Sequence, residues 1–133
     1  MFKSTHRAQL ESLEPRQLLS AAYDYLSDLQ PTSANNGFGP VEQDLSNGED
    51  GLADGAQIKI NGQRYTKGLG MHAYGEVHFE LNGRYRNFIS DVGIDDESGR
   101  IGTAIFRVYA DGEKLFDSGV MTGMKSAKRV NIA

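Results

Sequence analysis

Short runs of alternating apolar and polar residues, each closed by a turn dipeptide, limit what this chain can fold into more than any other feature of its sequence. The alternation has the two-residue period of strands with one buried face, and Asn-Gly or Asp-Gly between two such runs is typical of a tight hairpin. The runs cover residues 58–60, 77–81, 87–94, 105–110, 114–116 and 130–132, and the turns are Asn61-Gly62, Asn82-Gly83 and Asp111-Gly112. Since no amphipathic helical pattern separates the runs, the sequence predicts an all-β fold, an antiparallel sandwich or jelly roll.

Size and charge exclude several classes of function. The chain of 133 residues has room for one domain with one modest core. Its formal charge is −4 and its 14 Lys and Arg are spread along the sequence, so nucleic-acid binding is not expected. No apolar run approaches the roughly 18 residues of a membrane-spanning helix, so membrane insertion is not expected either. The absence of cysteine excludes disulfides, thiolate zinc sites and a cysteine nucleophile.

Residues 1–22 differ from the rest and are predicted to stand outside the domain. They place Pro15 within a helix-like pattern and lack the apolar centre of an ordinary signal peptide. The stretch LEPRQLLSA, residues 13–21, resembles the LEPR-XLL leader found in many large secreted or surface proteins of certain bacteria. That resemblance implies export, to the medium or the cell surface. We therefore predict an export leader or disordered N-terminus over residues 1–22 and a folded domain over residues 23–133.

The segment from residue 23 to residue 55 is rich in turn dipeptides and acidic side chains. Its Asn-Gly and Asp-Gly pairs, with two prolines, exclude a continuous helix. The acidic residues do not have the spacing of an EF-hand calcium loop. A solvated acidic loop is the favoured interpretation.

From Tyr25 onward the sequence resembles the NPCBM domain, a carbohydrate-binding module with a galactose-binding-like β-sandwich. The strings that carry the resemblance are YLSDL, GFGPVEQDLSNG and residues 60–119, and the strings KGLGMHA, VGIDDE and VYADGEKLFDSGV, the last of which ends at Val120, follow in that order. The resemblance implies a non-catalytic module, with a galactose-like glycan as its partner, of the kind appended to glycoside hydrolases and other secreted bacterial proteins. Family members continue with a further apolar strand and a segment containing Asp, His and Trp, whereas this chain ends at Ala133 without any tryptophan. We therefore expect the sandwich to be incomplete at its C-terminus, with strand edges unpaired.

The heptapeptide KGLGMHA, residues 67–73, raises the question whether His72 serves the fold or a ligand. In a structural role, the glycines allow a close approach of the backbone, Leu69 and Met71 are buried, and His72 hydrogen-bonds a nearby loop. In a ligand role, the turn supplies the aromatic faces and fixed hydrogen-bonding groups that a sugar requires. The structural role is favoured for His72.

The candidate carbohydrate-binding residues lie on and around this turn, with one on a later strand: Tyr65, Lys67, His72, Tyr74 and Arg107. The two tyrosines are the better candidates, because tyrosine offers both a ring face and a hydroxyl. For Arg107, in mid-strand, the solvent-facing half of the alternation is the favoured interpretation.

Three interpretations stand for the carboxylates of DVGIDDESG, residues 91–99. A glycosidase pair is disfavoured, because adjacent Asp95 and Asp96 project to opposite faces of an extended strand. Both residues are candidates for a structural calcium ion. The favoured alternative is that Asp95 caps a loop by accepting backbone N–H bonds.

Catalytic machinery is not visible elsewhere. His72 and His78 are six residues apart, which matches no zinc helix motif, and the glycines form no phosphate-binding pattern. We therefore predict a non-catalytic carbohydrate-binding module of a secreted or surface bacterial protein, targeting a linked glycoside hydrolase to galactose-like glycans. The alternative is a structural or interaction β-sandwich of a surface protein without glycan affinity.

Overall fold

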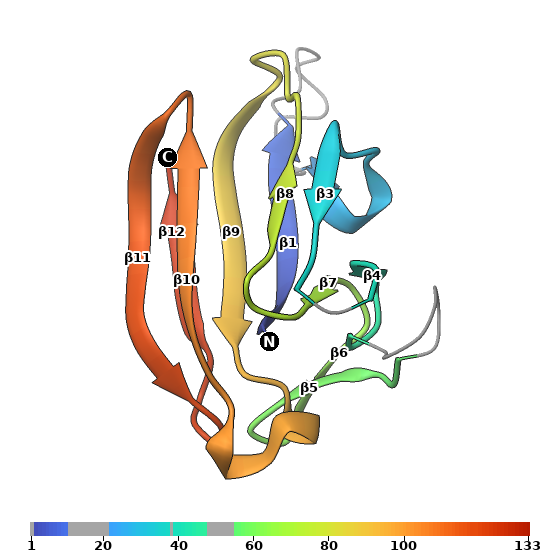
Figure 1. The fold of residues 1–133 in the computed structure, drawn as a ribbon. Coiled ribbons are helices and arrows are strands. Elements are labelled where there is room, and N and C mark those ends of the chain that lie inside the picture. Colours follow the sequence, from blue (N-terminus) through green and yellow to red (C-terminus); the bar gives the residue numbers. More distant parts are fainter. Residues whose placement is uncertain (1, 11–21, 38, 48–54) are drawn as a thin grey trace.

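The computed structural model describes residues 2–10, 22–37, 39–47 and 55–133 (Figure 1). Regular structure in these ranges is almost entirely strand, interrupted by two short 3₁₀ helices, η2 (Leu26–Asp28) and η3 (Asp96–Ile101). In chain order the strands are β1 (Phe2–Leu10), β2 (Ala22–Asp24), β3 (Ser33–Asn35), β4 (Glu42–Gln43), β5 (Ile58–Ile60), β6 (Gln63–Tyr65), β7 (Leu69–Met71), β8 (Glu76–His78), β9 (Tyr85–Gly93), β10 (Thr103–Ala110), β11 (Glu113–Thr122) and β12 (Lys128–Ile132). The all-β prediction is confirmed.

A six-stranded antiparallel sheet forms the larger layer. Its main path runs β12–β9–β1–β7–β4, and β2 also pairs with β1. One edge of β1 pairs with β9 from Lys3 to Leu10. The other edge pairs with β7 near the start of β1 and with β2 near its end. β1 therefore lies in the interior of the sheet, as Figure 1 shows.

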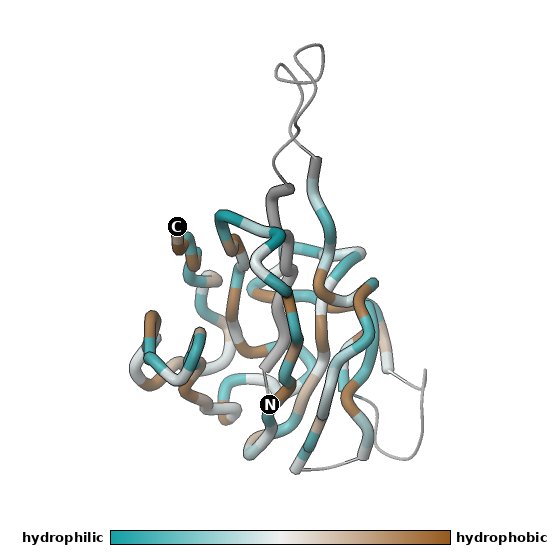
Figure 2. The backbone as a smooth tube through the Cα atoms, turned by 90° about the horizontal axis from the view of Figure 1, so that it is seen from above, coloured by the Kyte–Doolittle hydropathy of each residue, from teal (hydrophilic) through white to brown (hydrophobic). Residues whose placement is uncertain are grey.

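The β10–β11 hairpin forms the opposing layer, and the main core lies between it and strands β9 and β12. The buried residues of this core are Val92, Ile94, Ala104, Phe106, Met121 and Val130. Alternation on β10 follows the prediction, because Phe106 is buried while Ile105 and Tyr109 are exposed. Figure 2 shows apolar and polar stretches interleaved along several strands. Each large apolar side chain removed from water stabilises such a core by roughly 1.5–3 kcal/mol.

The β5–β6 hairpin closes one end of the sandwich. Its turn has positive φ at Asn61 (48°) and Gly62 (84°), the conformation that an Asn-Gly hairpin turn favours. Ile60 is buried and packs so closely on Gly93, at the end of β9, that a Cβ on the glycine would lie 2.6 Å from the Ile60 side chain. The hairpin is thereby fixed against the large sheet.

Most predicted runs are strands, and the differences have clear causes. The strand predicted over 77–81 is shorter in the structure, because β8 ends at His78. His78 pairs with Ser33, the first residue of the three-residue strand β3, so the ladder ends there. Ala110 shares the alternation of the buried Phe106, which predicts a buried position, but it is exposed because it lies at the tip of the β10–β11 hairpin. Among the described residues, no helix is long and apolar enough to cross a membrane.

The N-terminal prediction covers residues that the structure describes only in part. Residues 2–10 form β1, so a segment that the sequence placed outside the domain contributes backbone pairing to the sheet. The LEPRQLLSA stretch, residues 13–21, lies outside the described residues, and the export leader stays a prediction.

The place of β1 generates a test of the sheet. We expect a chain lacking residues 2–10 to lose more than about 2 kcal/mol of unfolding free energy, because β9 and β7 would each lose a ladder of backbone hydrogen bonds. Urea unfolding gives the free energy, and hydrogen exchange at the β9 amides gives the location. A chain in which residues 11–21 are replaced by a Gly/Ser linker serves as control. Equal stability and equal exchange in the truncated chain would contradict the pairing.

Candidate functional site

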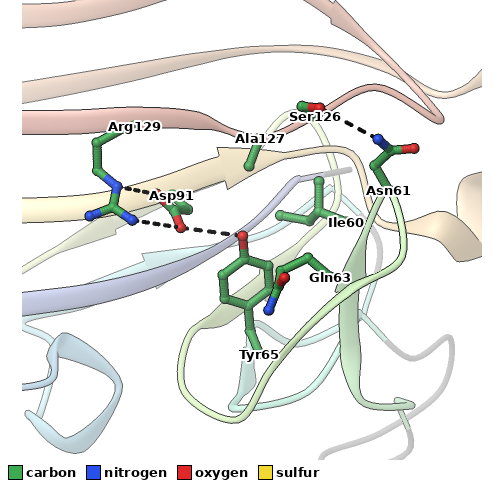
Figure 3. Close-up of a pocket in the computed structure, with 8 residues that line it drawn as sticks. All are labelled: Ile60, Asn61, Gln63, Tyr65, Asp91, Ser126, Ala127 and Arg129. Atoms are coloured by element: carbon green, nitrogen blue, oxygen red, sulfur yellow. Dashed lines mark hydrogen bonds and ion pairs between the residues drawn. The ribbon is translucent and has the colours of Figure 1, made fainter.

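A concave pocket lies where the β5–β6 hairpin meets strands β9 and β12 (Figure 3). Its volume of about 340 Å³ falls in the range of small-ligand sites. Two apolar side chains and six polar or aromatic ones line it: Ile60, Asn61, Gln63, Tyr65, Asp91, Ser126, Ala127 and Arg129. The pocket thus joins an apolar wall to several hydrogen-bonding groups, as sites for polar organic ligands do.

Asp91 is the centre of the hydrogen-bond network in the pocket. Arg129 donates from Nε to Oδ1 of Asp91 and from Nη2 to Oδ2, the latter at 3.2 Å. The Tyr65 hydroxyl donates to the same Oδ2 at 3.2 Å. Figure 3 shows the three side chains converging from three different strands. A two-pronged guanidinium–carboxylate pair of this kind fixes the orientation of both groups.

Strand register explains why these residues meet. Arg129 of β12 lies directly opposite Asp91 of β9 in the antiparallel ladder. The neighbours Ser90 and Val92 are buried, so the two-residue period turns Asp91 to the other face of the sheet. The turn of the β5–β6 hairpin then brings Tyr65 back over that face. The pocket is therefore a product of sheet pairing, not of one loop.

The electrostatics of the pocket are those of a neutral site. The Arg129 guanidinium compensates the Asp91 carboxylate, whose side chain is only 19% exposed. Burial, together with the adjacent Asp91 carboxylate, raises the pKa of Tyr65 to about 12. The tyrosine is accordingly a neutral hydrogen-bond donor at physiological pH. The amide groups of Asn61 and Gln63 add donors and acceptors without adding charge.

Lys67, a predicted ligand residue, is held in an ion-pair cluster away from the pocket lining. Its Nζ contacts the carboxylates of Asp28 and Asp44, the latter at 2.8 Å, and lies 5.5 Å from the ring centre of Tyr25. Burial opposes the charge on Asp44, but hydrogen bonds from Lys67 and from the Gly68 N–H outweigh it, and the pKa of Asp44 is lowered. Lys67 thereby ties η2 and the turn after β4 to the start of β7.

The packing predicted for the glycines, Leu69 and Met71 of the KGLGMHA turn is confirmed, while the choice between a structural and a ligand role for His72 stays a prediction. Leu69 and Met71 are buried. A Cβ on Gly70 would lie 2.2 Å from the Leu45 carbonyl oxygen, so only glycine permits this approach. The backbone N–H of His72 donates to Asn36 Oδ1, at 2.6 Å, in the neighbouring loop. The His72 side chain is exposed.

The remaining predicted ligand residues are also placed apart from the pocket. Tyr74 is 72% exposed, beside Glu76 and His78 of β8. Arg107 faces solvent from β10, as the alternation favoured, and donates to Asp117 at 3.0 Å. A backbone N–H from Gly119, followed by the bonds from Arg107 and Lys114, lowers the pKa of Asp117 to about 2. Of the five predicted residues, only Tyr65 lines the pocket.

Asp95 and Asp96, the calcium candidates, both accept backbone hydrogen bonds. Asp95 is buried and accepts from the N–H groups of Lys59 and Glu97, at 2.8 and 2.9 Å. Asp96 accepts from the N–H groups of Asn61 and Gly62, at 2.8 and 2.9 Å. The loop-capping role of Asp95 is confirmed. The described part of the chain contains no group of three or more His, Cys, Asp or Glu arranged to hold a metal ion.

Sequence reasoning missed the partners of Tyr65 in the pocket. In the sequence, Asp91 stands out only as part of an acidic string, and no motif marks Arg129 as a ligand residue. The signal that joins them is the pairing register of β9 with β12, which alternation alone does not specify.

Comparison with known proteins gives a consistent match. Residues 22–133 match the model of the NPCBM/NEW2 domain. The chain is 38% identical over 109 residues to a putative endo-α-N-acetylgalactosaminidase of Renibacterium salmoninarum, covering 81% of this chain and 7% of that protein. It is 33% identical over 79 residues to alpha-1,3-galactosidase B of Akkermansia muciniphila, covering 58% of this chain and 10% of that protein. The chain thus spans a tenth or less of the length of these curated relatives.

Two solved structures of Clostridium perfringens modules have the same fold. The first, CBM51 of GH95 in complex with methyl-galactose, has 39% identity and a TM-score of 0.71, with 82% of this chain and 77% of that one covered. The second is a structure of ZmpB that contains CBM51-2 in complex with GlcNAc together with INT domains. It has 29% identity and a TM-score of 0.70, with 85% of this chain and 27% of that one covered.

The Lys67 cluster generates a prediction about stability. We expect Lys67→Met to lower the unfolding free energy by about 1 kcal/mol, because Asp28 and Asp44 would face each other without the cation between them. Lys114→Met, at a more exposed ion pair on β11, is the matched control and should change stability less. Urea unfolding of both variants measures the difference. If Lys67→Met unfolds at the same urea concentration as the native chain, the ion-pair cluster of Lys67 does not stabilise the fold.

The raised pKa of Tyr65 gives a prediction about alkaline pH. Because the folded-state pKa, about 12, exceeds the ordinary value of 10.0, the contribution of Tyr65 to stability is complete below pH 10 and is lost as the pH rises through about 12. Difference titration of tyrosinate absorbance between the native chain and Tyr65→Phe isolates this group from the other five tyrosines. A difference curve centred near pH 10 would contradict the burial and the Asp91 contact.

Proposed function

Because the chain belongs to the NPCBM/NEW2 domain family, we propose that it binds a neutral sugar of the galactose type in the pocket of Tyr65, Asp91 and Arg129. The domain is a carbohydrate-binding module of a non-catalytic family with a galactose-binding-like β-sandwich. The observation that carries the choice of site is the pocket itself, which combines an aromatic ring, a fixed ion pair and two side-chain amides in one concavity.

The chemistry of the pocket suits a pyranose ring. Ile60, Ala127 and the Tyr65 ring offer apolar surface to the C–H face of a sugar. Asn61 and Gln63 offer both donors and acceptors to its hydroxyls. Asp91 is anchored by two partners, and its remaining lone pairs can accept from a sugar hydroxyl without reorganising the site.

Charge favours a neutral ligand over an acidic one. An acidic sugar requires an uncompensated cation, whereas Arg129 is already paired with Asp91. The galactose preference has separate support, because the CBM51 structure with 39% identity was determined with methyl-galactose. The GlcNAc complex of CBM51-2, with 29% identity, makes that sugar the natural comparison ligand.

The wider setting of the domain follows from its relatives. The curated relatives carry glycosidase names, and another solved structure joins the CBM51-1 and CBM51-2 domains of ZmpB to an M60 catalytic domain. We accordingly propose that this domain belongs to a secreted or surface protein and directs a linked catalytic domain to its glycan. The LEPR-XLL resemblance supports the same location.

A purely structural role is the second candidate function. On the outer face of the β10–β11 hairpin, Ile105, Leu115 and Val120 are exposed, Val120 to 69%. Within the described residues, β11 pairs only with β10 in a sheet. Exposed strand edges of this kind are sites where chains associate.

Calorimetry with methyl galactoside and with GlcNAc tests the proposed sugar site. We expect a dissociation constant between roughly 1 mM and 1 μM for the galactoside and weaker binding of GlcNAc. Tyr65→Ala and Arg129→Ala should each weaken the binding about tenfold or more, because one removes the stacking surface and the other leaves Asp91 uncompensated.

Tyr109→Ala, which removes an exposed tyrosine from β10 at a distance in the fold, is the matched control and should bind as the native chain does. Binding that persists unchanged in both pocket variants would refute this site. Cooperative unfolding without binding to any tested sugar would favour the structural role.

A further inference from the structure

A second group of exposed polar and aromatic side chains lies on β8 and on the loop before it. Tyr74 is 72% exposed, and its hydroxyl donates to Oε1 of Glu76. The other oxygen of Glu76, Oε2, lies 3.1 Å from Nε2 of His78. The Glu76 and His78 side chains are 44% and 59% exposed. One carboxylate thus holds an aromatic ring on one side and an imidazole on the other.

The backbone beneath this group is held firmly. β8 pairs with β3, with Glu76 opposite Asn35. The carbonyl oxygen of His78 accepts from both the backbone N–H and the hydroxyl of Thr32, at 2.8 and 3.2 Å. The side chains therefore stand on a paired strand, and a ligand would meet them with little ordering cost.

The loop that carries Tyr74 is fastened from the other side. Asn36 accepts from the His72 N–H at 2.6 Å and donates from Nδ2 to Asn47 Oδ1 at 2.6 Å. The N–H of Gly37 donates to the His72 carbonyl at 3.2 Å. A Cβ at Gly37 would lie 2.3 Å from the Ala73 carbonyl oxygen, so the two loops are in direct contact.

We propose that Tyr74, Glu76 and His78 form a second carbohydrate-contact surface, separate from the pocket, that takes a neutral sugar with vicinal hydroxyls. The Tyr74 ring faces solvent although its hydroxyl is restrained, which leaves the ring available for stacking on a sugar face. Each Glu76 oxygen has a lone pair beyond the one already used, so the carboxylate can accept from two neighbouring hydroxyls. The exposed Glu76 carboxylate disfavours a uronic or other acidic sugar.

The surface and the pocket are built from different parts of the fold. The pocket lies on β5, β6, β9 and β12, whereas Tyr74, Glu76 and His78 belong to β8 and its preceding loop. None of the three lines the pocket. The inference shares the ligand class of the proposed function but depends on none of its residues.

Nuclear magnetic resonance titration of the ¹⁵N-labelled full chain resolves the two surfaces in one experiment. The probes are methyl galactoside, GlcNAc and, as an acidic comparison, methyl glucuronide, each added to on the order of 50 mM. We expect the neutral sugars to shift the amides of residues 72–78 and, with a separate concentration dependence, those of the Tyr65 pocket. Methyl glucuronide should leave residues 72–78 unshifted.

Three variants separate the contributions. Tyr74→Ala should weaken binding at residues 72–78 roughly tenfold or more and leave the pocket titration unchanged. Glu76→Gln should weaken binding at the same site although the Tyr74 ring stays in place. If Tyr74 and Glu76 served only the fold, this substitution would leave sugar binding unchanged. Tyr109→Ala is the matched control for loss of an exposed tyrosine and should alter neither titration.

The outcomes distinguish the two proposals. Shifts at the pocket alone would overturn the second surface and leave the first site standing. Shifts at residues 72–78 alone, abolished by Tyr74→Ala, would support the second surface and overturn the proposed sugar site in the pocket. Shifts at neither place with any neutral sugar, in a folded chain, would overturn both.

Discussion

The carboxylates of Asp95 and Asp96 fix the position on which the candidate site depends. Between them they accept backbone hydrogen bonds from Lys59, Asn61 and Gly62, and so hold the β5–β6 hairpin on the end of the sandwich. Asp95 is almost fully buried, where an unpaired carboxylate would be costly, and its two backbone donors offset that cost. Without this attachment, Tyr65 would have no fixed place over Asp91. A pair of adjacent acids that suggests catalysis or calcium in the sequence thus anchors the hairpin that forms one wall of the candidate pocket.

Alternation and turn chemistry made the strands predictable, because both are local properties. The β10–β11 hairpin follows from Asp111-Gly112 between two alternating runs, and the close approach at Gly70 follows from the glycines of KGLGMHA. Among the residues that line the pocket, only Tyr65 was predicted from the sequence as a ligand residue. Its other principal members meet through the register of β12 against β9, which depends on contacts far apart in the sequence. The ion-pair cluster of Lys67 was not predictable for the same reason, since its partners Asp28 and Asp44 come from distant turns.

The N-terminal strand β1 is part of the large sheet, yet it adjoins a stretch that resembles an export leader. Backbone pairing places β1 between β9 and β7, the strands that carry Asp91 and the KGLGMHA turn. The sequence resemblance assigns the adjoining residues 13–21 to an export leader. If residues 2–10 stay with the domain, β1 completes the sheet between β9 and β7. If it is removed, β9 keeps β12 as a partner, so the Arg129–Asp91 pair retains its backbone support while the sheet loses its middle.

Charge links the two proposed sugar surfaces to the composition of the chain. The molecule carries a formal charge of −4, and the cation that lines the pocket, Arg129, is paired with the Asp91 carboxylate. Both surfaces therefore present hydrogen-bonding groups without an uncompensated positive charge, which suits the hydroxyls of neutral sugars. A single shallow contact of this kind binds weakly. Two binding surfaces on one domain can contact neighbouring sugars of the same glycan. Once one surface is bound, the other meets its sugar at a high effective concentration. Under the proposed function, such a domain would stay on a dense glycan surface while releasing isolated sugars readily.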